Sequence, residues 1–369
     1  MCLDFGEDDY EESVEEAVRL VESAGVARHR VVRGRRSRPD PKFYAGSGKL
    51  AEVARAAAEL NAAFVVFNHD LSPAQQRNAE KELGGVRVFD RTELILEIFA
   101  QRAQTSEGKL QVELAHLQHL STRLVRGWTH LERQRGGMSK TGGPGEKQIE
   151  LDRRYIAQRI KVLNEKIKKL QRQREIQRRG RARGEVLSVS LVGYTNAGKS
   201  TLFNALSRAQ AYEADQLFAT LDTTTRRLWL PDAGQVVLSD TVGFIRGLPH
   251  GLVAAFRATL EETLRADLLL HVVDAASPVR EAQREQVNKV LEEIGARDLA
   301  QIEVWNKIDV AGLEPRAERD LYGKISRVFV SARSGAGLEA LRGGLAEFAR
   351  ARAMARGAAQ NSLHSHSLR

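Results

Sequence analysis

The residues with the clearest chemical potential form a glycine-rich loop. Gly193-Tyr-Thr-Asn-Ala-Gly-Lys-Ser200 fits the pattern G-x-x-x-x-G-K-[ST], between a strand pattern over 186–192 and a helix pattern over 201–206. Such glycines let backbone N–H groups curl around phosphates at a helix N-terminus. Lys199 should reach the β- and γ-phosphates, and the Ser200 hydroxyl should ligate Mg²⁺. The predicted phosphate contacts are Gly193, Tyr194, Thr195, Asn196, Ala197, Gly198, Lys199, Ser200 and Thr201.

A second motif follows this loop at the end of another strand pattern, residues 236–240. Asp240-Thr-Val-Gly243 fits the pattern D-x-x-G. The Asp240 carboxylate would hold Mg²⁺ through water, and the Gly243 N–H would sense the γ-phosphate. A motif this short is informative only because of its place after the phosphate loop. The predicted contacts are Asp240, Thr241, Val242 and Gly243.

A third motif predicts which base is read. Asn306-Lys-Ile-Asp309 follows an apolar strand pattern and fits N-K-x-D. The Asp309 carboxylate can accept from N1–H and the 2-amino group of guanine, a pair that adenine does not offer, so a site built this way discriminates strongly. Asn306 would tether neighbouring loops, and the Lys307 stem would pack on the base. The predicted guanine contacts are Asn306, Lys307, Ile308 and Asp309, with a backbone N–H at Ser331 or Ala332 facing O6.

A threonine-rich loop, residues 216–226, lies where the first switch of such an enzyme belongs. One threonine there should close over Mg²⁺ and the γ-phosphate. The candidates are Thr220, Thr223, Thr224 and Thr225, and spacing cannot choose among them.

The residue after the D-x-x-G glycine is Phe244. Ras-type GTPases place there a glutamine that orients the attacking water. Because phenylalanine cannot do this, the water-positioning group must come from elsewhere in the chain or from a partner. The sequence therefore predicts slow intrinsic turnover and activation by a partner.

Each motif follows a strand pattern, so a sheet must bring the motifs together at the carboxyl ends of its strands. We predict an α/β fold: a P-loop GTPase domain with a mostly parallel sheet and helices on both faces, preceded by a small α/β domain and a long antiparallel helical hairpin. The predicted boundaries are 1–108, 109–184 and 185–350. Residues 351–369 are short, polar and expected to be a disordered tail.

The first of these domains alternates helix and strand patterns. Residues 48–61 predict a helix, 63–67 a buried strand, Ser72-Pro73 the start of a second helix, and 86–89 a second strand. This order and spacing predict a small parallel α/β domain. Gly46-Ser-Gly-Lys49 resembles half of a phosphate loop, but the preceding glycine spacing is missing, which favours a helix-entry turn.

The second domain carries two heptad seams, in which apolar residues alternate at spacings of four and three. The glycine-rich segment 136–145 between them cannot be helical, so we expect two long antiparallel helices with an exposed tip loop. The seam residues include Leu110, Leu114, Leu117, Leu124 and Leu131 in the first arm, and Ile156, Ile160, Leu163, Ile167 and Leu170 in the second.

The second arm is strongly basic: residues 152–183 hold 13 Lys or Arg against three Asp or Glu. One interpretation is a solvated helix face with a disordered basic linker. The favoured one is binding to nucleic-acid phosphate, because charges this one-sided repel each other unless an anion compensates. The whole chain agrees, with 57 Lys+Arg, 48 Asp+Glu and a net charge of +9.

Other features bear on cellular context. A single cysteine, Cys2, excludes an internal disulfide and fits a reducing compartment. The acidic N-terminus is not a secretory signal, and no apolar run approaches the roughly 18 residues of a membrane span. We expect a cytoplasmic protein, monomeric, without a membrane span.

Together GYTNAGKS, QLFATLD, DTVGFIR, LPHGLVAAF and NKID resemble the HflX family of translation-associated GTPases. The likeness extends upstream through FDRTELILEIFAQRA, EGKLQVELAHL, STRLVRGWTHLERQ and GGPGEKQIELDRR, and covers roughly residues 40–345. The resemblance implies GTP as substrate, Mg²⁺ as cofactor, and binding to the large ribosomal subunit and its RNA. It also implies a role in dissociating or rescuing stalled ribosomes, often under stress.

The resemblance also bears on individual residues. In such GTPases the threonine of the FATLD segment takes the switch role, which favours Thr220. The implied switch contacts are Phe218, Ala219, Thr220, Leu221 and Asp222; the implied metal ligands are Ser200 and Thr220; and the implied catalytic set is Lys199, Asp240, Gly243 and Thr220. The family often has arginine where this chain has Gly142, and proline where it has Thr223.

Two alternatives remain open at this point. A ribosome-assembly GTPase would carry the same phosphate chemistry. A nucleotide-gated RNA-binding module would hydrolyse GTP only incidentally, although the intact Lys199, Ser200 and Asp240 favour a working hydrolase.

Overall fold

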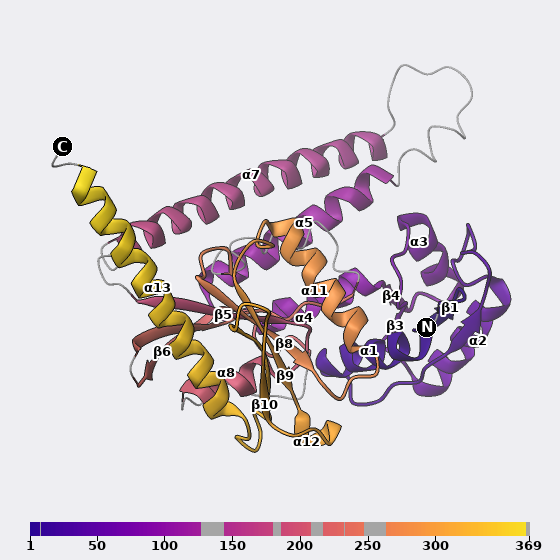
Figure 1. Cartoon of the computed structure of the whole chain (residues 1–369). Helices are drawn as coiled ribbons and strands as arrows, with labels where there is room; N and C mark the ends of the chain where they lie inside the picture. Colours follow the sequence, from indigo (N-terminus) through magenta and orange to yellow (C-terminus); the bar gives the residue numbers. More distant parts are fainter. Residues whose placement is uncertain are drawn as a thin grey trace. The chain divides into compact units, whose positions relative to one another are not determined.

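The structure, a computed structural model, describes residues 1–7, 9–126, 144–179, 186–207, 217–231, 233–246 and 263–366. The chain divides into two compact units, one built from most of residues 1–178 and the other from most of 179–369 (Figure 1). The described part contains no helix that is long and apolar enough to cross a membrane.

The N-terminal part of the first unit is a small parallel α/β domain, as predicted. Parallel pairs form between β1 and β2 and between β3 and β4, and the Asn68 N–H donates to the Met1 carbonyl across β1 and β3. Ser72 and Gln75 form a capping box before α3, and α2 begins after a positive-φ turn at Gly46, as expected for a helix entry. The elements are β1 Cys2–Asp4, α1 Tyr10–Ser23, β2 Arg33–Arg35, α2 Ser47–Leu60, β3 Phe64–Val66, α3 Pro73–Glu82, β4 Arg87–Phe89 and α4 Arg91–Arg102.

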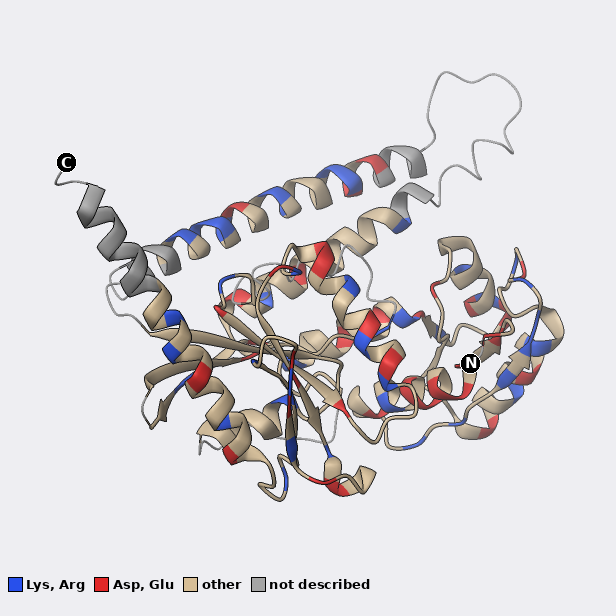
Figure 2. Cartoon of the chain, viewed as in Figure 1, with Lys and Arg blue, Asp and Glu red and all other residues tan. Residues whose placement is uncertain are grey.

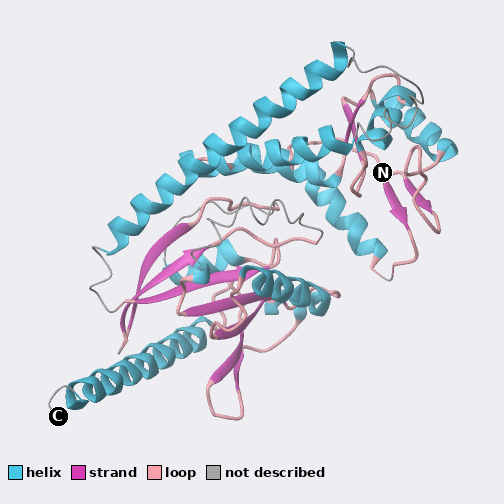
Figure 3. Ribbon diagram, turned by 90° about the horizontal axis from the view of Figure 1, so that it is seen from above, coloured by secondary structure: helices cyan, strands magenta, loops and turns pink. Residues whose placement is uncertain are grey.

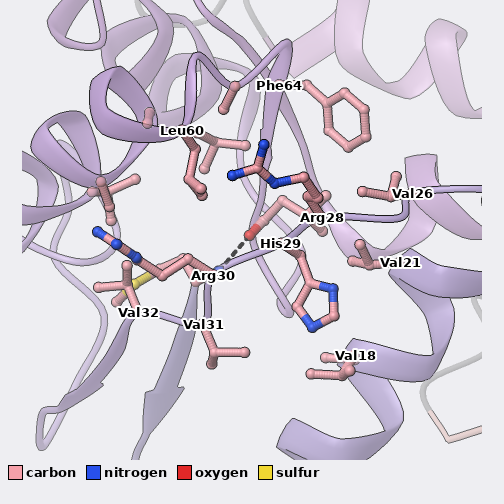
Figure 4. A pocket seen from close by; sticks show the side chains of 18 of the residues that line it. Val18, Val21, Val26, Arg28, His29, Arg30, Val31, Val32, Leu60 and Phe64 are labelled. Atoms are coloured by element: carbon pink, nitrogen blue, oxygen red, sulfur yellow. Dashed lines mark hydrogen bonds between the residues drawn. The ribbon is translucent and has the colours of Figure 1, made fainter.

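Helices α1 and α2 cover opposite faces of these strands. Cys2 packs with Val14 and Ala17 of α1, whereas its neighbour Leu3 belongs to the cluster that contains Leu50 of α2. A cavity of about 300 Å³ lies beside Met1 and is lined mainly by apolar side chains of both helices and of the strand segments between them (Figure 4). The side chains between the two helices and the strands therefore do not fill the interior of this domain completely.

The hairpin consists of α5 Ser106–Arg126 and α7 Pro144–Arg179 (Figure 1). The predicted seam forms: Leu114 packs with Leu163 and Ile167, and Glu113 pairs with Arg159 across it at 2.6 Å. The tip loop was predicted to reach Gly145, but α7 already begins at Pro144, since proline is favoured in a first helical turn. Residues 136–143, Leu131 and residues 180–183 lie outside the described residues.

The second unit is built on a sheet whose strands are among the magenta arrows of Figure 3. Its seven strands have the order β10-β11-β9-β8-β5-β7-β6. The described strands run parallel except the two edge strands, β6 and β10, which pair antiparallel with β7 and β11. Two strands were not predicted: β10, and β6, which begins at Thr224 inside the expected switch loop. The strands are β5 Leu187–Gly193, β6 Thr224–Leu230, β7 Gly234–Asp240, β8 Leu268–Asp274, β9 Gln301–Asn306, β10 Arg316–Arg319 and β11 Ile325–Phe329.

Helices pack on this sheet from two sides. Leu202 and Phe203 of α8 (Lys199–Ser207) and Leu341 of α13 join one core with the strands, while α11 (Arg280–Ile294) packs on β8 and β5 outside that core cluster. The tail prediction is wrong, because α13 runs from Leu338 to His366. Polar composition suggested disorder, but this segment is rich in alanine and arginine, which are strong helix formers.

Candidate functional site

The glycine-rich loop joins the central strand β5 to α8, and two of its glycines are required by close neighbours. A Cβ on Gly193 would lie 2.3 Å from the Val272 carbonyl oxygen of the adjacent strand, and one on Gly198 would lie 2.2 Å from Nδ2 of Asn306. Both glycines, and Asn196, have positive φ. The loop therefore curls tightly over the carboxyl end of the sheet, with Ala197 buried inside it.

Lys199, at the first residue of α8, is buried beneath this loop. Its ammonium group donates to the Tyr194 carbonyl oxygen at 2.8 Å. Burial lowers the pKa of Lys199 to about 8, while Asp240 acts to raise it and Lys307 to lower it further. A phosphate bound beside this buried lysine would stabilise the charged form of its ammonium group.

Three oxygen-bearing side chains converge in front of α8. The Ser200 hydroxyl donates to Oδ2 of Asp240 at 2.8 Å, Thr220 Oγ1 donates to the same oxygen at 2.9 Å, and the two hydroxyls lie 2.8 Å apart. Within the described residues, Asp240 Oδ1 is buried without a hydrogen-bond partner, and burial raises the pKa of this carboxyl group. We call these residues the oxygen cluster.

The oxygen cluster suits Mg²⁺. Hard oxygen donors, here two hydroxyls and a carboxylate with one unused oxygen, are what this cation prefers. The structure also distinguishes Thr220 from two of the other candidate threonines, because Thr220 joins the cluster whereas Thr224 and Thr225 lie within β6.

The segment before Thr220 closes over the phosphate loop. The Phe218 N–H donates to Oγ1 of Thr195 at 3.3 Å, and Phe218 is buried with positive φ. A cavity of about 50 Å³ lies between this segment and the loop. Among its lining residues are Asn196, Lys199, Thr201, Ala219, Thr241 and Gly243. Leu221 is also buried and Asp222 is half-buried.

The D-x-x-G segment packs directly against the phosphate loop. A Cβ on Gly243 would lie 2.8 Å from Cα of Thr195 and 2.9 Å from Nζ of Lys199, so only glycine fits. The Phe244 N–H donates to the Gly193 carbonyl at 3.1 Å, and the Phe244 carbonyl accepts from the Thr195 N–H at 2.6 Å. Thr241 is turned inward, donating to the Leu191 carbonyl at 2.6 Å, and Val242 is buried. The Phe244 side chain is buried too.

Asn306 ties the predicted guanine end together. Its Nδ2 donates to the Ala197 carbonyl at 3.0 Å, and its Oδ1 accepts from the Ala332 N–H at 2.9 Å. The Ser331 N–H donates to the Ala336 carbonyl. An O6 contact from Ala332 would thus have to share its N–H with Asn306. Lys307 follows with a positive φ of 64°, Ile308 is buried, and Asp309 is exposed.

Sequence reasoning missed Asp274. This residue ends β8 beside Asn306 of β9, and its Oδ2 pairs with Nζ of Lys307 at 2.7 Å. A signal was available, because Asp274 is a carboxylate directly after the apolar strand pattern at 268–273, as Asp240 is after its own strand.

Comparisons with known proteins match three successive segments of the chain. A family model described as 50S ribosome-binding GTPase matches residues 188–307, and models described as GTP-binding GTPase N-terminal and GTP-binding GTPase Middle Region match 11–100 and 102–181. The chain is 55% identical to the GTPase HflX of Escherichia coli K12 over 338 residues, which is 91% of this chain and 79% of that protein. It is 51% identical to the GTPase HflX of Magnetococcus marinus over 93% of this chain and 79% of that protein.

The chain belongs to the HflX family of GTPases. As an HflX protein it is a GTP hydrolase with a ribosome-binding type of GTPase domain. A solved structure described as a complex of SsGBP and GDP is 27% identical to this HflX chain, with a TM-score of 0.51, and the match covers 92% of this chain and 96% of that one.

Proposed function

We propose that this protein binds the large ribosomal subunit and uses GTP binding and hydrolysis to dissociate or rescue ribosomes, with Mg²⁺ as cofactor. The observation that carries the switch is the oxygen cluster, in which Thr220 meets Ser200 and Asp240. A loop residue that joins the phosphate loop and a strand carboxylate in one place can report the nucleotide state. The three-domain division, a cytoplasmic location and a monomeric state are parts of the proposal.

In this proposal each end of the site has a separate task. Ser200 and Thr220 would ligate Mg²⁺ and Asp240 would hold it through water, where the cation would supply positive charge beside the β- and γ-phosphates. Lys199 binds those phosphates, and the Gly243 N–H senses the γ-phosphate. At the other end Asp309 reads the guanine edge while the Lys307 stem packs on the base.

Phe244 supports a dependence on the ribosome. Its side chain is buried and its backbone is bonded to the phosphate loop on both sides, so it offers no polar group to an attacking water. The group that orients this water must then be supplied by another segment or by the ribosome. We expect slow basal turnover that large subunits accelerate.

The basic face of α7 supports RNA as the partner (Figure 2). Its exposed cations include Arg153, Lys161, Lys166, Lys168, Lys169 and Arg172. Each phosphate that such a face neutralises releases counterions, so binding should weaken steeply with salt. Ribosome-stimulated hydrolysis should accordingly fall steeply between about 50 and 200 mM salt, while basal hydrolysis changes far less.

The test is multiple-turnover hydrolysis with and without purified large subunits, across that salt range. A charge-reduced variant, Lys161→Gln with Lys168→Gln and Arg172→Gln, should lose much of the stimulation and keep basal turnover. Substituting Arg316, an exposed arginine of β10, by glutamine is the matched control. A stimulated rate that ignores both salt and the triple variant would mean that the GTPase domain engages the ribosome without the arm.

Sedimentation of ribosomal particles after incubation with the protein distinguishes ribosome dissociation from ribosome assembly. Whole ribosomes incubated with the protein and a non-hydrolysable GTP analogue should split into subunits if the protein dissociates them. An assembly factor would instead bind incomplete large particles and leave whole ribosomes intact.

A further inference from the structure

Asp274 holds two groups at the guanine end at once. Its Oδ2 pairs with Nζ of Lys307 at 2.7 Å, and its Oδ1 accepts from the Ala276 N–H at 3.0 Å. The backbone is fixed as well, because Asp274 is paired with Asn306 in the parallel register and the Ala275 N–H donates to the Asn306 carbonyl at 2.9 Å. The carboxylate therefore stands on a rigid strand end, with one oxygen closing a turn and the other on the lysine.

Lys307 is a side chain that needs such an anchor. It follows Asn306 in a left-handed backbone conformation and its side chain is 29% exposed. A free lysine side chain carries about 2 kcal/mol of rotamer entropy, which is lost when the stem is ordered against a ligand. With its ammonium held by Asp274 before any ligand arrives, most of that loss has already occurred.

We propose that Asp274 is a positioning residue that orients the Lys307 stem across the face of the guanine and so sets how long the nucleotide stays bound. The inference rests on the proposed packing of this stem against the base. Asp274 itself does not touch the nucleotide.

Asp274→Asn separates the two tasks of this residue. The asparagine oxygen can still accept from Ala276, so the turn is kept, but the ion pair with Lys307 is lost. Dissociation of fluorescent GDP should become about 5- to 10-fold faster, which corresponds to roughly 1–1.4 kcal/mol of lost anchoring. The association rate and the melting temperature should stay unchanged, because Asp274 does not touch the nucleotide and the turn at Ala276 is kept.

Energetic coupling between Asp274 and Lys307 distinguishes a positioning role from a merely structural one. Lys307→Met keeps the stem and removes the ammonium, so it should speed GDP dissociation as Asp274→Asn does, and the double variant should be no faster than either single one. Asp274→Glu should restore part of the wild-type rate. Asp298→Asn, at an exposed carboxylate shortly before β9, is the matched control and should have no effect.

Additive effects of the two single variants, or unchanged dissociation in Asp274→Asn, would overturn the inference. Failure of the underlying function looks different. If Asp309→Asn leaves the preference for GTP over xanthosine triphosphate intact, the segment is not the base reader, whatever Asp274 does.

Discussion

At the phosphate end of the nucleotide site Lys199 is buried with a lowered pKa, and one oxygen of Asp240 has no partner within the described residues. At the guanine end the amide of Asn306 is bonded through both its polar atoms, and Lys307 is paired with Asp274. The phosphate end thus holds a desolvated ammonium group and a buried carboxylate oxygen without a partner in the described part of the chain, whereas the amide of Asn306 and the ammonium of Lys307 are already paired within the protein.

The difference indicates how the work is divided. Unsatisfied buried groups are costly, so an anion at Lys199 or a cation at Asp240 would relieve a cost that the free protein carries. A pre-bonded frame, in contrast, keeps its shape with or without ligand and can read a base with little reorganisation. Substitution of Lys199 should therefore mainly weaken binding, whereas substitution of Asn306 should mainly lower the stability of the free protein.

The largest effect is expected at Lys199. Lys199→Ala removes the cation that faces the β- and γ-phosphates, and losing one partner of a buried charge pair costs on the order of 4 kcal/mol, or roughly a thousandfold in Kd. Lys199→Met should bind equally poorly, yet melt at a higher temperature than the wild type, because a desolvated ammonium has been removed. Calorimetric titration with GTP and thermal melting of the free proteins measure both. A lower melting temperature for Lys199→Met would contradict the proposed difference between the phosphate end and the guanine end.

The next effect is expected at Asp309. Asp309→Asn should weaken GTP by about 3 kcal/mol, since the base donors are left without a carboxylate. It should also favour xanthosine triphosphate, whose 2-oxo group accepts from the new amide. Competition between the two nucleotides for the variant measures the inversion. Asp309 is exposed, so the melting temperature of the free protein should not change.

Asn306 should behave as a frame residue. Asn306→Ala leaves the Ala197 carbonyl and the Ala332 N–H unpaired, which costs about 2 kcal/mol of stability and about 4–8 °C in melting temperature. The loss should appear in the nucleotide-free protein, in contrast to Lys199→Met. If melting is unchanged, the frame is not pre-formed.

The smallest predicted effect is the pH dependence of GDP binding. The pKa of Lys199 is about 8 in the free protein, and a bound phosphate raises it. Well below pH 8 the lysine is charged in both states and affinity should be level; above pH 8 binding takes up a proton, so Kd should rise about fivefold between pH 8 and 9. Lys199→Arg, charged throughout, should show no such slope.

Much of the site could be predicted because its chemistry depends on short, fixed spacings. The phosphate loop, Asp240 and Asn306 each stand at a strand end, where the patterns put them. Thr220 could not be chosen by spacing among four threonines, since closure of a loop is a property of tertiary packing; only the family resemblance favoured it. Asp274 was missed because a lone carboxylate after a strand carries no motif of its own.

Elements were misread where composition and context disagree. Strand β6 begins with Thr-Thr-Arg-Arg and has apolar residues only at its end, 228–230, so its first half resembles a loop until β7 pairs with it. The polarity of residues 351–369 predicts disorder, but α13 is anchored through Leu341 and Leu345 in the core and continues from there to His366.

Three hydrogen bonds fasten the segment that follows the D-x-x-G motif to the phosphate loop. Phe244 contributes two backbone hydrogen bonds to the loop, and the Arg246 N–H donates to the Tyr194 hydroxyl at 2.8 Å. Three such bonds contribute roughly 2–4 kcal/mol, so the form in which they are broken would amount to about one molecule in thirty to one in a thousand. A partner that forms a few new hydrogen bonds with the broken form can invert an equilibrium of that size. The three bonds therefore keep the two segments together in the free protein, and a docking partner can still separate them.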